Sequence, residues 1–400
     1  MPDASAIHES RFGVSATVVV NSPGRINLIG EHTDYCGLPV LPMAIRQGIQ
    51  IAASESAQPG LAAVSTLDDV VISSMGAGER RGWAKYVLAV LDEVGPAAAD
   101  RGARLAIDGD LPATGGLSSS SALAVGCVIA LSELWDLALS PQEIVAGSMA
   151  AEQSAAIAGG AMDQTVITLA RPGHALRIEF DPPSHRHIPM PDDFTWVAGY
   201  SGTRAAKGES AATAYNSFVL TSRAAAAVLA EQLGRDAGTP PLLSKVGDAS
   251  PDQIAALRPM TVEAAAAITG GDSLGLEPGG TLNLRISAEH VLSEAARVDA
   301  AERALAAADR AELGRLMNAS HASLEIYGAS TDSLDALVTA AREAGAAGAR
   351  LTGAGFGGWA IALTSPTNAD AVREAMETIG GGPTLIAQAG GGALWSLHGP

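Results

Sequence analysis

Apolar positions in the first half of the chain fall into two kinds of pattern. Short apolar runs, which are typical of strands, occupy residues 16–20, 49–53 and 105–108. Longer apolar stretches predict helices over residues 119–134 and 141–158. This half of the chain therefore mixes strands with helices.

The second half continues the mixture, and no internal repeat is visible. A strand is predicted over 194–199, and Ala-rich helices are predicted around 211–233 and 288–308. The Gly- and Pro-rich stretch 270–280 between those helices predicts a loop. The last third alternates two helices with three strands, namely helices at 334–343 and 369–379 and strands at 349–351, 359–363 and 383–387.

The length of 400 residues is typical of about two domains. The segment 181–193 is rich in Pro, His and Asp, so it is the best candidate for a domain junction. We therefore predict domains over residues 1–190 and 191–400. The segment contains a His-x-His pair, His185 and His187. Zinc would need further ligands, and none stands out in the sequence, which favours ordinary surface histidines.

The formal net charge of −18 excludes whole classes of partner. Neither nucleic acid nor an anionic membrane surface is expected to bind a chain without a compensating basic patch. The N-terminal residues 1–13 lack the apolar core of a signal peptide, and two acidic residues interrupt the longest apolar stretch, 122–139. The two cysteines, Cys36 and Cys127, are typical of reduced thiols. We expect a soluble cytoplasmic protein.

The segment from Ser22 to Tyr35 concentrates polar chemistry. It contains one arginine, two carboxylates, a histidine and two glycines, interleaved with three apolar residues. Burying such a cluster is unfavourable and is not needed for folding, so it indicates a polar ligand. The alternative is a charged surface loop, but the interleaved apolar residues favour a half-buried backbone that presents polar groups to a cleft.

A second cluster runs from Leu111 to Leu123, where two glycines and four serines lead into an apolar helix. Glycines allow a ligand to approach the backbone, and the free N–H groups of a helix N-terminus bind anions. The alternative is a serine-capped helix, for which one serine would suffice. The chain has no Gly-Lys pair and only three lysines, so a Walker-A loop is excluded. If the protein binds ATP, the serines and the dipole of this helix have to do much of the work that lysine does elsewhere in binding the phosphates.

Two acidic residues flank a helix end rich in Ala and Gly. Asp163 follows Gly159 and Gly160, where it could orient a substrate hydroxyl. Glu152 could hold Mg²⁺ together with a serine hydroxyl and phosphate oxygens. The alternative is that both carboxylates are simply solvated. The glycines of 353–358 match a dinucleotide-binding pattern formally, but a strand follows them where that fold requires a helix.

These segments, in this order, resemble the galactokinases of the GHMP small-molecule kinase superfamily. Gly-Arg-Ile-Asn-Leu-Ile-Gly-Glu-His-Thr-Asp-Tyr, at 24–35, is similar to the galactokinase signature. The serine motif at 115–122 and the glycine motif at 351–358 are similar to the second and third superfamily motifs. The similarity runs from about residue 22 to 363 and includes the shorter segments 40–45, 83–87, 160–164 and 316–323.

The resemblance implies an α/β (α+β) fold with two GHMP kinase domains, the first like ribosomal protein S5 and the second ferredoxin-like. It implies ATP-dependent phosphorylation of the anomeric hydroxyl of galactose in a cleft between the domains, with Mg²⁺ as cofactor. By the same resemblance, Asp163 is the catalytic aspartate and Arg25 stabilises the transferring phosphoryl group. The sugar-binding residues implied are Glu31, His32, Asp34, Gly160 and Tyr215.

The remaining implied residues bind the nucleotide and the metal. Trp83 matches a residue near the adenine, and Ser120 with Glu152 matches the Mg²⁺-binding pair. The phosphate-binding motif consists of Gly115, Gly116, Leu117, Ser118, Ser119, Ser120 and Ser121. We expect small-molecule partners only, and a monomer or weak dimer.

Departures from the family pattern at Cys36, Leu38 and Trp359 concern the sugar more than the reaction. Another sugar, such as N-acetylgalactosamine, galacturonate or arabinose, is therefore the first alternative. A carboxylate at Glu31 would repel a uronic acid, which favours a neutral sugar. A non-catalytic sugar sensor is the second alternative, although the serine motif, Arg25 and Asp163 are all intact. A dinucleotide oxidoreductase is the most remote.

Overall fold

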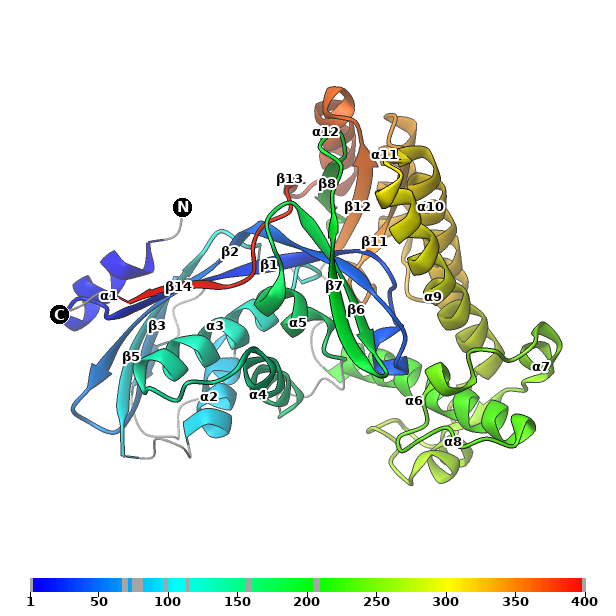
Figure 1. Ribbon diagram of the computed structural model, residues 1–400, viewed down its shortest axis with the longest axis horizontal. Coiled ribbons are helices and arrows are strands. Elements are labelled where there is room, and N and C mark those ends of the chain that lie inside the picture. The colour runs from blue at the N-terminus through cyan, green and yellow to red at the C-terminus, as the bar shows by residue number, and fades with distance from the viewer. Residues whose placement is uncertain are drawn as a thin grey trace.

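The computed structural model describes most of the chain, namely residues 3–66, 71–73, 82–95, 100–112, 115–154, 160–203 and 209–397. Two domains and a helical lobe lie along the long axis of the molecule (Figure 1). Among the described helices, none has the length and apolar character needed to cross a membrane.

The N-terminal domain is built on a six-stranded sheet in the order β14-β1-β2-β5-β3-β4. Its strands are β1 (Val18–Ile29), β2 (Leu41–Ser56), β3 (Gly60–Ser65), β4 (Val71–Ser73), β5 (Gly102–Gly109) and β14 (Leu394–Leu397). Neighbouring strands are antiparallel except for the parallel pair of β3 and β5. The alternating side chains of these strands supply two apolar faces, and both are covered by helices.

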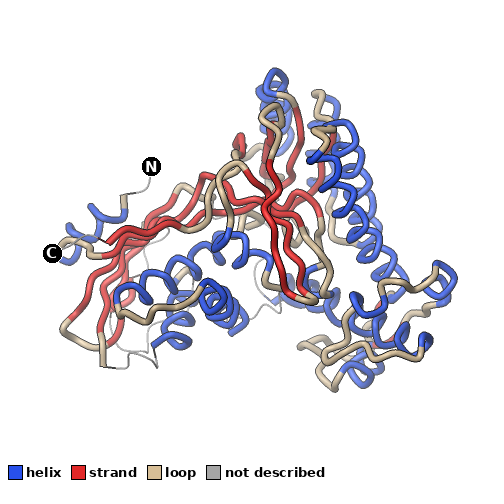
Figure 2. Tube along the Cα trace, in the orientation of Figure 1, coloured by secondary structure: helices blue, strands red, loops and turns tan. Residues whose placement is uncertain are grey.

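Helices lie on both faces of this sheet (Figure 2). One face packs against α1 (Ala4–Phe12), and the other packs against a layer of helices. That layer consists of α2 (Ala84–Val94), α3 (Ser119–Leu134), α4 (Pro141–Ser154) and α5 (Met162–Leu169). Because α3 is buried almost all round, its apolar run has no polar face. Its polar N-terminal serines lie beside β1.

A two-stranded ribbon, β6 (His174–Phe180) and β7 (Pro183–Pro189), follows the helical layer. The segment 181–193, which we predicted as the best candidate for a domain junction, contains β7. The ribbon is attached to the next domain by ion pairs. Arg177 and Arg186 both contact the Glu302 carboxylate, at 2.8 and 2.5 Å.

The C-terminal domain has a ferredoxin-like topology. Its antiparallel sheet has the order β11-β12-β8-β13, formed by β8 (Thr195–Tyr200), β11 (Gly348–Thr352), β12 (Trp359–Thr364) and β13 (Thr384–Ala387). The covering helices are α9 (Leu284–Ala306), α10 (Arg310–Tyr327), α11 (Asp332–Glu343) and α12 (Ala369–Gly380). The βαββαβ order confirms the predicted two-domain α/β fold.

A helical lobe is inserted after β8 and has its own apolar core (Figure 1). It comprises α6 (Glu209–Leu233), the 3₁₀ turn η3 (Leu243–Val246), α7 (Pro251–Ala256) and α8 (Val262–Thr269), with the short strands β9 (Met260–Thr261) and β10 (Thr281–Leu282). The loop predicted over 270–280 connects α8 to β10.

The last strand of the chain crosses the predicted domain boundary. β14 pairs with β1, so that Leu397 lies opposite Val18 and Leu394 opposite Asn21. The division at residues 190 and 191 stays a prediction, but the N-terminal sheet includes residues from the C-terminal end of the chain.

Candidate active site

Arg25 and Asp163 form the centre of the candidate site. Arg25 lies in β1, between two irregularities of its pairing with β2, and Asp163 lies in the first turn of α5. The guanidinium donates two hydrogen bonds to the carboxylate, from Nε to Oδ1 at 2.8 Å and from Nη2 to Oδ2 at 2.9 Å. Burial opposes the charge of Arg25, but the carboxylates of Asp163 and Glu31 outweigh it and raise the arginine pKa. The structure thus places a fixed cation against the predicted catalytic acid.

The serine motif closes around this ion pair. Arg25 Nη1 donates to the carbonyl oxygen of Gly116 at 2.7 Å, and the Ser118 hydroxyl donates to Asp163. Gly116 has a φ of 98°, and a Cβ there would lie 3.1 Å from the ring of Trp359. Glycine is therefore required at this position. The loop turns directly into α3, whose first N–H groups are available to an anion.

Glu152, at the C-terminal end of α4, is the second acid of the site. Its carboxylate accepts hydrogen bonds from Ser121 Oγ at 2.7 Å and from the amide of Gln164, and the Ser120 hydroxyl also bonds to it. Burial raises its pKa, and the charge of Asp163 adds to the effect. A buried carboxylate flanked by hydroxyl oxygens has the donor atoms that Mg²⁺ prefers, so these residues fit the predicted metal.

Asp34, Gly160 and Tyr215 lie together on the other side of Asp163. Burial raises the pKa of Asp34 to about 7, and the neighbouring charges of Asp163 and Glu31 act in the same direction. A Cβ on Gly160 would overlap the Asp34 carboxylate. Burial raises the pKa of Tyr215, and the negative charges of Asp34 and Asp163, which lie near its phenol, raise it further.

His32 belongs to an aromatic cluster next to this group. Its Nδ1 lies 3.0 Å from the Tyr35 hydroxyl, and its ring contacts those of Tyr215, Phe218 and Tyr327. Burial lowers the pKa of His32 to about 3, so the ring is neutral. Its role as a sugar ligand stays a prediction, and its packing against the helical lobe is observed.

Glu31 connects the signature segment to the glycine motif. Its Oε2 accepts from Asn27 Nδ2 at 2.7 Å, and its Oε1 accepts from the backbone N–H of Gly353 at 2.8 Å. The guanidinium of Arg350, in β11, lies 3.5 Å from Oε1. Burial raises the pKa of Glu31 although Arg350 and Arg25 oppose the shift. Glu31 therefore connects the signature segment to the C-terminal domain.

Sequence reasoning missed Arg350 and Glu294, which are both fully buried. Arg350 Nη1 donates to the Asn27 carbonyl at 3.2 Å, and its Nη2 lies 3.8 Å from Glu294 Oε1. Glu294 accepts from the backbone N–H of Gly30 at 3.0 Å and from the Ser320 hydroxyl at 2.6 Å. The nearby arginines offset the effect of burial and lower the pKa of Glu294 to about 2. An ionised network thus holds the signature backbone against the C-terminal domain.

The remaining predicted residues are packed rather than exposed. Trp83 precedes α2 and is buried in the core of the N-terminal domain, so its contact with an adenine stays a prediction. Trp359 is fully buried behind Gly116. Cys36 and Leu38 pack with the core of the helical lobe, which explains these two departures as packing contacts. Neither Cys36 nor Cys127 forms a disulfide, as predicted.

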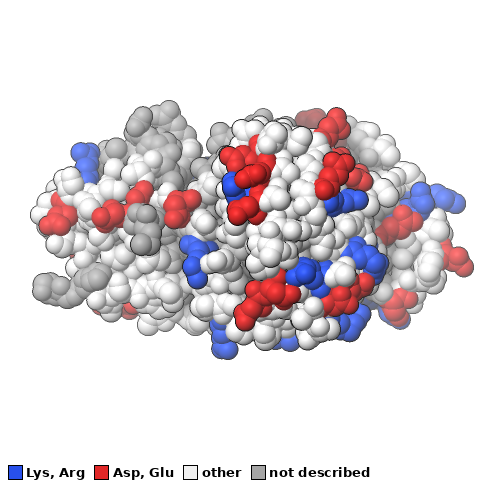
Figure 3. Space-filling view, turned by 90° about the horizontal axis from the view of Figure 1, so that it is seen from above, with Lys and Arg blue, Asp and Glu red and all other residues white. Residues whose placement is uncertain are grey.

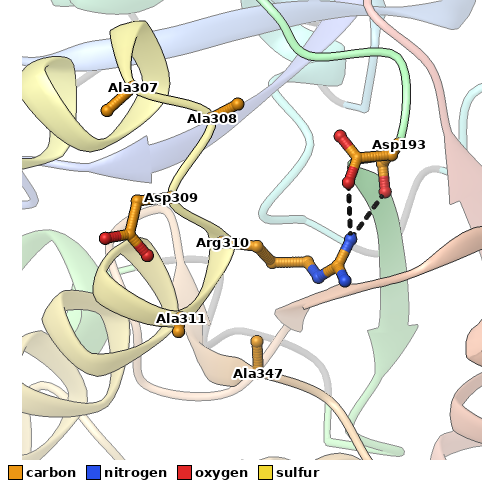
Figure 4. A pocket seen from close by; sticks show the side chains of 7 residues that line it. All are labelled: Asp193, Ala307, Ala308, Asp309, Arg310, Ala311 and Ala347. Carbon is orange, nitrogen blue, oxygen red and sulfur yellow. Dashed lines mark hydrogen bonds and ion pairs between the residues drawn. The ribbon is translucent and has the colours of Figure 1, made fainter.

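A hollow of about 520 Å³ at the turn between α9 and α10 contains none of these residues. The Arg310 side chain there donates to the carbonyl and the carboxylate of Asp193, at 3.1 and 3.0 Å (Figure 4). The charge of Arg310 is paired with Asp193, so we interpret the hollow as a gap beside a structural ion pair. On the face shown in Figure 3, acidic and basic side chains of the described residues are interspersed, without a continuous basic patch.

Family models match three parts of the chain. The N-terminal and C-terminal GHMP kinase domain models match residues 84–171 and 301–382, which define a small-molecule kinase of the GHMP class. The model of the galactokinase galactose-binding signature matches residues 6–55, the part that carries Arg25, Glu31 and Asp34.

Curated relatives match nearly the whole chain. A galactokinase of Chloroflexus aurantiacus is 35% identical over 381 residues, which cover 93% of this chain and 90% of the relative. A galactokinase of Streptococcus thermophilus is 31% identical, with 96% of each chain covered. The chain therefore belongs to the galactokinase family.

Solved structures agree with this assignment. The crystal structure of Lactococcus lactis galactokinase complexed with galactose matches with a TM-score of 0.80 and 28% identity, covering 98% of both chains. The mevalonate kinase of Methanococcus jannaschii matches with a TM-score of 0.64 and 18% identity, covering 94% of this chain and 98% of that one. The second match shows the shared fold alone.

Proposed function

We propose that this protein transfers a phosphoryl group from ATP to the anomeric hydroxyl of galactose. The observation that carries the proposal is the Arg25–Asp163 pair, held between the Ser118 hydroxyl and the N-terminal end of α3. Phosphoryl transfer requires positioned groups and charge neutralisation more than covalent help from the protein. This group of residues offers both.

Each residue of the pair has a separate role in the reaction. Asp163 accepts a hydrogen bond from the anomeric hydroxyl and takes its proton as the oxygen–phosphorus bond forms. Arg25 orients Asp163 and offers positive charge to the phosphoryl oxygens as the bond to the leaving ADP breaks. Backbone N–H groups and serine hydroxyls at the start of α3 bind the phosphates of ATP.

Mg²⁺ is the expected cofactor. Glu152 and Ser120 would hold it, and the bound ion would neutralise phosphate charge. The buried carboxylate of Glu152, which lies next to the hydroxyls of Ser120 and Ser121, is the observation that supports a cation there. We retain the predictions of a cytoplasmic location and of a monomer or weak dimer.

The sugar end of the site supports a neutral hexose. Asp34 and Tyr215 lie within electrostatic reach of each other and of Asp163, and they offer hydrogen-bonding groups for sugar hydroxyls. A uronic acid would add a negative charge beside these carboxylates, which is unfavourable. N-acetylgalactosamine and arabinose stay open as alternatives. The intact Ser118–Ser121 segment and Arg25–Asp163 pair disfavour a non-catalytic sensor.

A coupled assay of ADP release tests the proposal. Galactose, ATP and Mg²⁺ together should give turnover, and removal of any one should abolish it. Asp163→Asn should lower kcat by about 10²-fold or more, because it removes the proton acceptor, while sugar binding changes little. Saturable galactose binding without ADP release would support the sensor instead, and turnover of a different sugar alone would correct the substrate.

A further inference from the structure

Gln164 is a buried residue of the candidate site that the proposed function leaves without a role. It follows Asp163 in the first turn of α5, and only 4% of it is exposed. A glutamine at this third helical position commonly bonds back to the backbone at the helix start, as Gln253 does in α7. The side-chain amide of Gln164 instead donates to Oε2 of Glu152, which lies in α4. The side chain therefore serves a carboxylate rather than the end of its own helix.

The two ends of this amide have different surroundings. An ionised carboxylate only accepts, so the nitrogen is the end that faces Glu152. The oxygen Oε1 of Gln164 is buried, and no donor among the described residues bonds to it. A buried acceptor without a donor is unfavourable, and such groups call for an explanation. The fold keeps Gln164 in this position despite its unsatisfied oxygen, which indicates that the contact with Glu152 is what the side chain is held for.

A count of lone pairs shows which oxygen of Glu152 stays available. Ser121 Oγ donates to Oε2 at 2.7 Å, and Gln164 donates to the same atom. The Ser120 hydroxyl also bonds to this carboxylate. An ionised carboxylate has about four acceptor positions, two on each oxygen. Because two donors share Oε2, at least one lone pair of Oε1 is left for a cation.

We propose that Gln164 is a positioning residue for Glu152, which holds Oε2 so that Oε1 is presented to Mg²⁺. This inference rests on the proposed function, because it takes Mg²⁺ to bind at Glu152. A carboxylate that is already held by two donors loses little further freedom when the ion binds. Carboxylates that bind metals are commonly held by hydrogen bonds of this kind, and loss of such a partner weakens metal binding.

The contact also connects the metal end of the site to the catalytic end. Asp163 and Gln164 are consecutive residues of α5, and they bond to Arg25 and Glu152, respectively. Ser121 lies between the two acids, with its Oγ 3.5 Å from Asp163 Oδ2. One turn of α5 therefore sets the position of the proton acceptor and of the metal ligand together.

Calorimetric titration of the full-length protein with ADP, once in MgCl₂ and once in EDTA, tests the proposal without turnover. We expect Mg²⁺ to tighten ADP binding by the unmodified protein. Gln164→Met keeps the length of the side chain but removes the donor, so about 10–100 times more Mg²⁺ should be needed for the same tightening. The Kd for ADP in EDTA should not change, because the serine end of α3 is unaltered. A general loosening of the structure would weaken ADP binding in both solutions.

Two further variants support the comparison. Gln164→Asn keeps the amide but withdraws it by one methylene, so its need for Mg²⁺ should rise as in Gln164→Met. Thr168→Val is the matched control, because Thr168 lies one turn further along α5 and its hydroxyl bonds to the Gln164 carbonyl at 2.7 Å. Its response to Mg²⁺ should equal that of the unmodified protein. Thermal melting should show that each variant is folded.

Glu152→Gln distinguishes failure of this inference from failure of the proposed function. If Glu152→Gln weakens the effect of Mg²⁺ but neither Gln164 variant does, the role of Gln164 alone is overturned. If Glu152→Gln leaves the effect of Mg²⁺ unchanged, the metal does not bind at Glu152, and that part of the proposed function fails as well. Weaker ADP binding in EDTA, or unfolding of both Gln164 variants, would show a structural role and also overturn the inference.

Discussion

Asp34 is an acid of the candidate site whose ionised form burial disfavours. Arg25 is bonded through two nitrogens to Asp163 and through the third to a carbonyl, so Asp34 has no equivalent partner there. The pKa of about 7 that follows from its burial means that folding takes up a proton at this side chain between about pH 4 and 7.

The stability of the protein should therefore depend on pH through Asp34. The folded-state pKa lies above the unfolded value of 3.8, so the contribution of Asp34 is most favourable below about pH 4 and is lost as the pH rises toward 7. Asp34→Asn removes this dependence. Urea unfolding should show that the free energy of unfolding falls from pH 5 to pH 8. We expect this fall to be smaller in Asp34→Asn than in the unmodified protein by about 1–3 kcal/mol. An equal fall in both proteins would contradict the assignment.

Gly160 offers a second test at the scale of one residue. A methyl group there would overlap the Asp34 carboxylate and displace it. Gly160→Ala should raise KM for galactose about tenfold or more, with a much smaller effect on KM for ATP. Gly147→Ala is the matched control, because a Cβ at that position meets no atom within 4 Å. Equal changes in the two KM values would show that Gly160 does not act on the sugar end.

The sequence alone indicated Arg25 and Asp163, but it did not indicate Arg350, which holds the signature segment in place. Arg25 and Asp163 lie in unusual local contexts, and the structure brings them into direct contact. Arg350 has no such context, because it lies in a short apolar strand and acts on Asn27, 323 positions away. Only the tertiary structure reveals such a partner.

At the scale of elements, β1 and β11 act as one unit. Asn27 exchanges hydrogen bonds with Thr352, whose hydroxyl both accepts its N–H at 3.0 Å and donates to its carbonyl at 3.2 Å. The guanidinium of Arg350 lies near both acids, with Nη1 3.5 Å from Glu31 Oε1 and Nη2 3.8 Å from Glu294 Oε1. The pairing fixes the signature segment relative to the glycine motif.

Removal of Arg350 should weaken the contact between β1 and β11 and lower the free energy of unfolding. Arg350→Met leaves the buried Glu31 and Glu294 without their shared cation, and breaking such a network costs about 3–5 kcal/mol. Denaturant unfolding should show this loss. Arg315→Met is the control, because the ion pair of Arg315 with Glu312 is exposed and contributes about 0–1 kcal/mol. A loss no larger than in the control would refute the role of the network.

Elements with clear periodicity were predicted well, and those with unusual composition were not. The helix over 119–134 coincides with α3. The strand predicted over 16–20 continues to Ile29 as β1, because two irregularities in its pairing let the strand accommodate polar residues. β7 was missed because it begins and ends with proline, which is disfavoured within strands, and only its pairing with β6 identifies it as a strand.

At the scale of the whole molecule, the two ends of the chain meet in one sheet. β14 is an edge strand whose side chains are all exposed, including Trp395 and Leu397. Its contribution comes from the backbone ladder with β1. The sequence did not predict this strand, because four residues carry too little pattern to indicate a partner more than 370 positions away.

Truncation tests the importance of that ladder. Removal of residues 394–400 exposes the edge of β1, so we expect a lower melting temperature and aggregation on heating. Removal of residues 398–400 alone is the control and should change neither. A melting temperature unaffected by the longer truncation would show that the N-terminal sheet is complete without β14.

The position of β14 also has a consequence for how the protein is made. Ribosomes add about 5–20 residues per second, so the synthesis that separates β1 from β14 takes about 20–80 s. For all of that time the outer edge of β1 has no strand beside it. A nascent chain of this protein therefore carries an open sheet edge until β14 has emerged, and a chaperone that binds this edge would act during that interval.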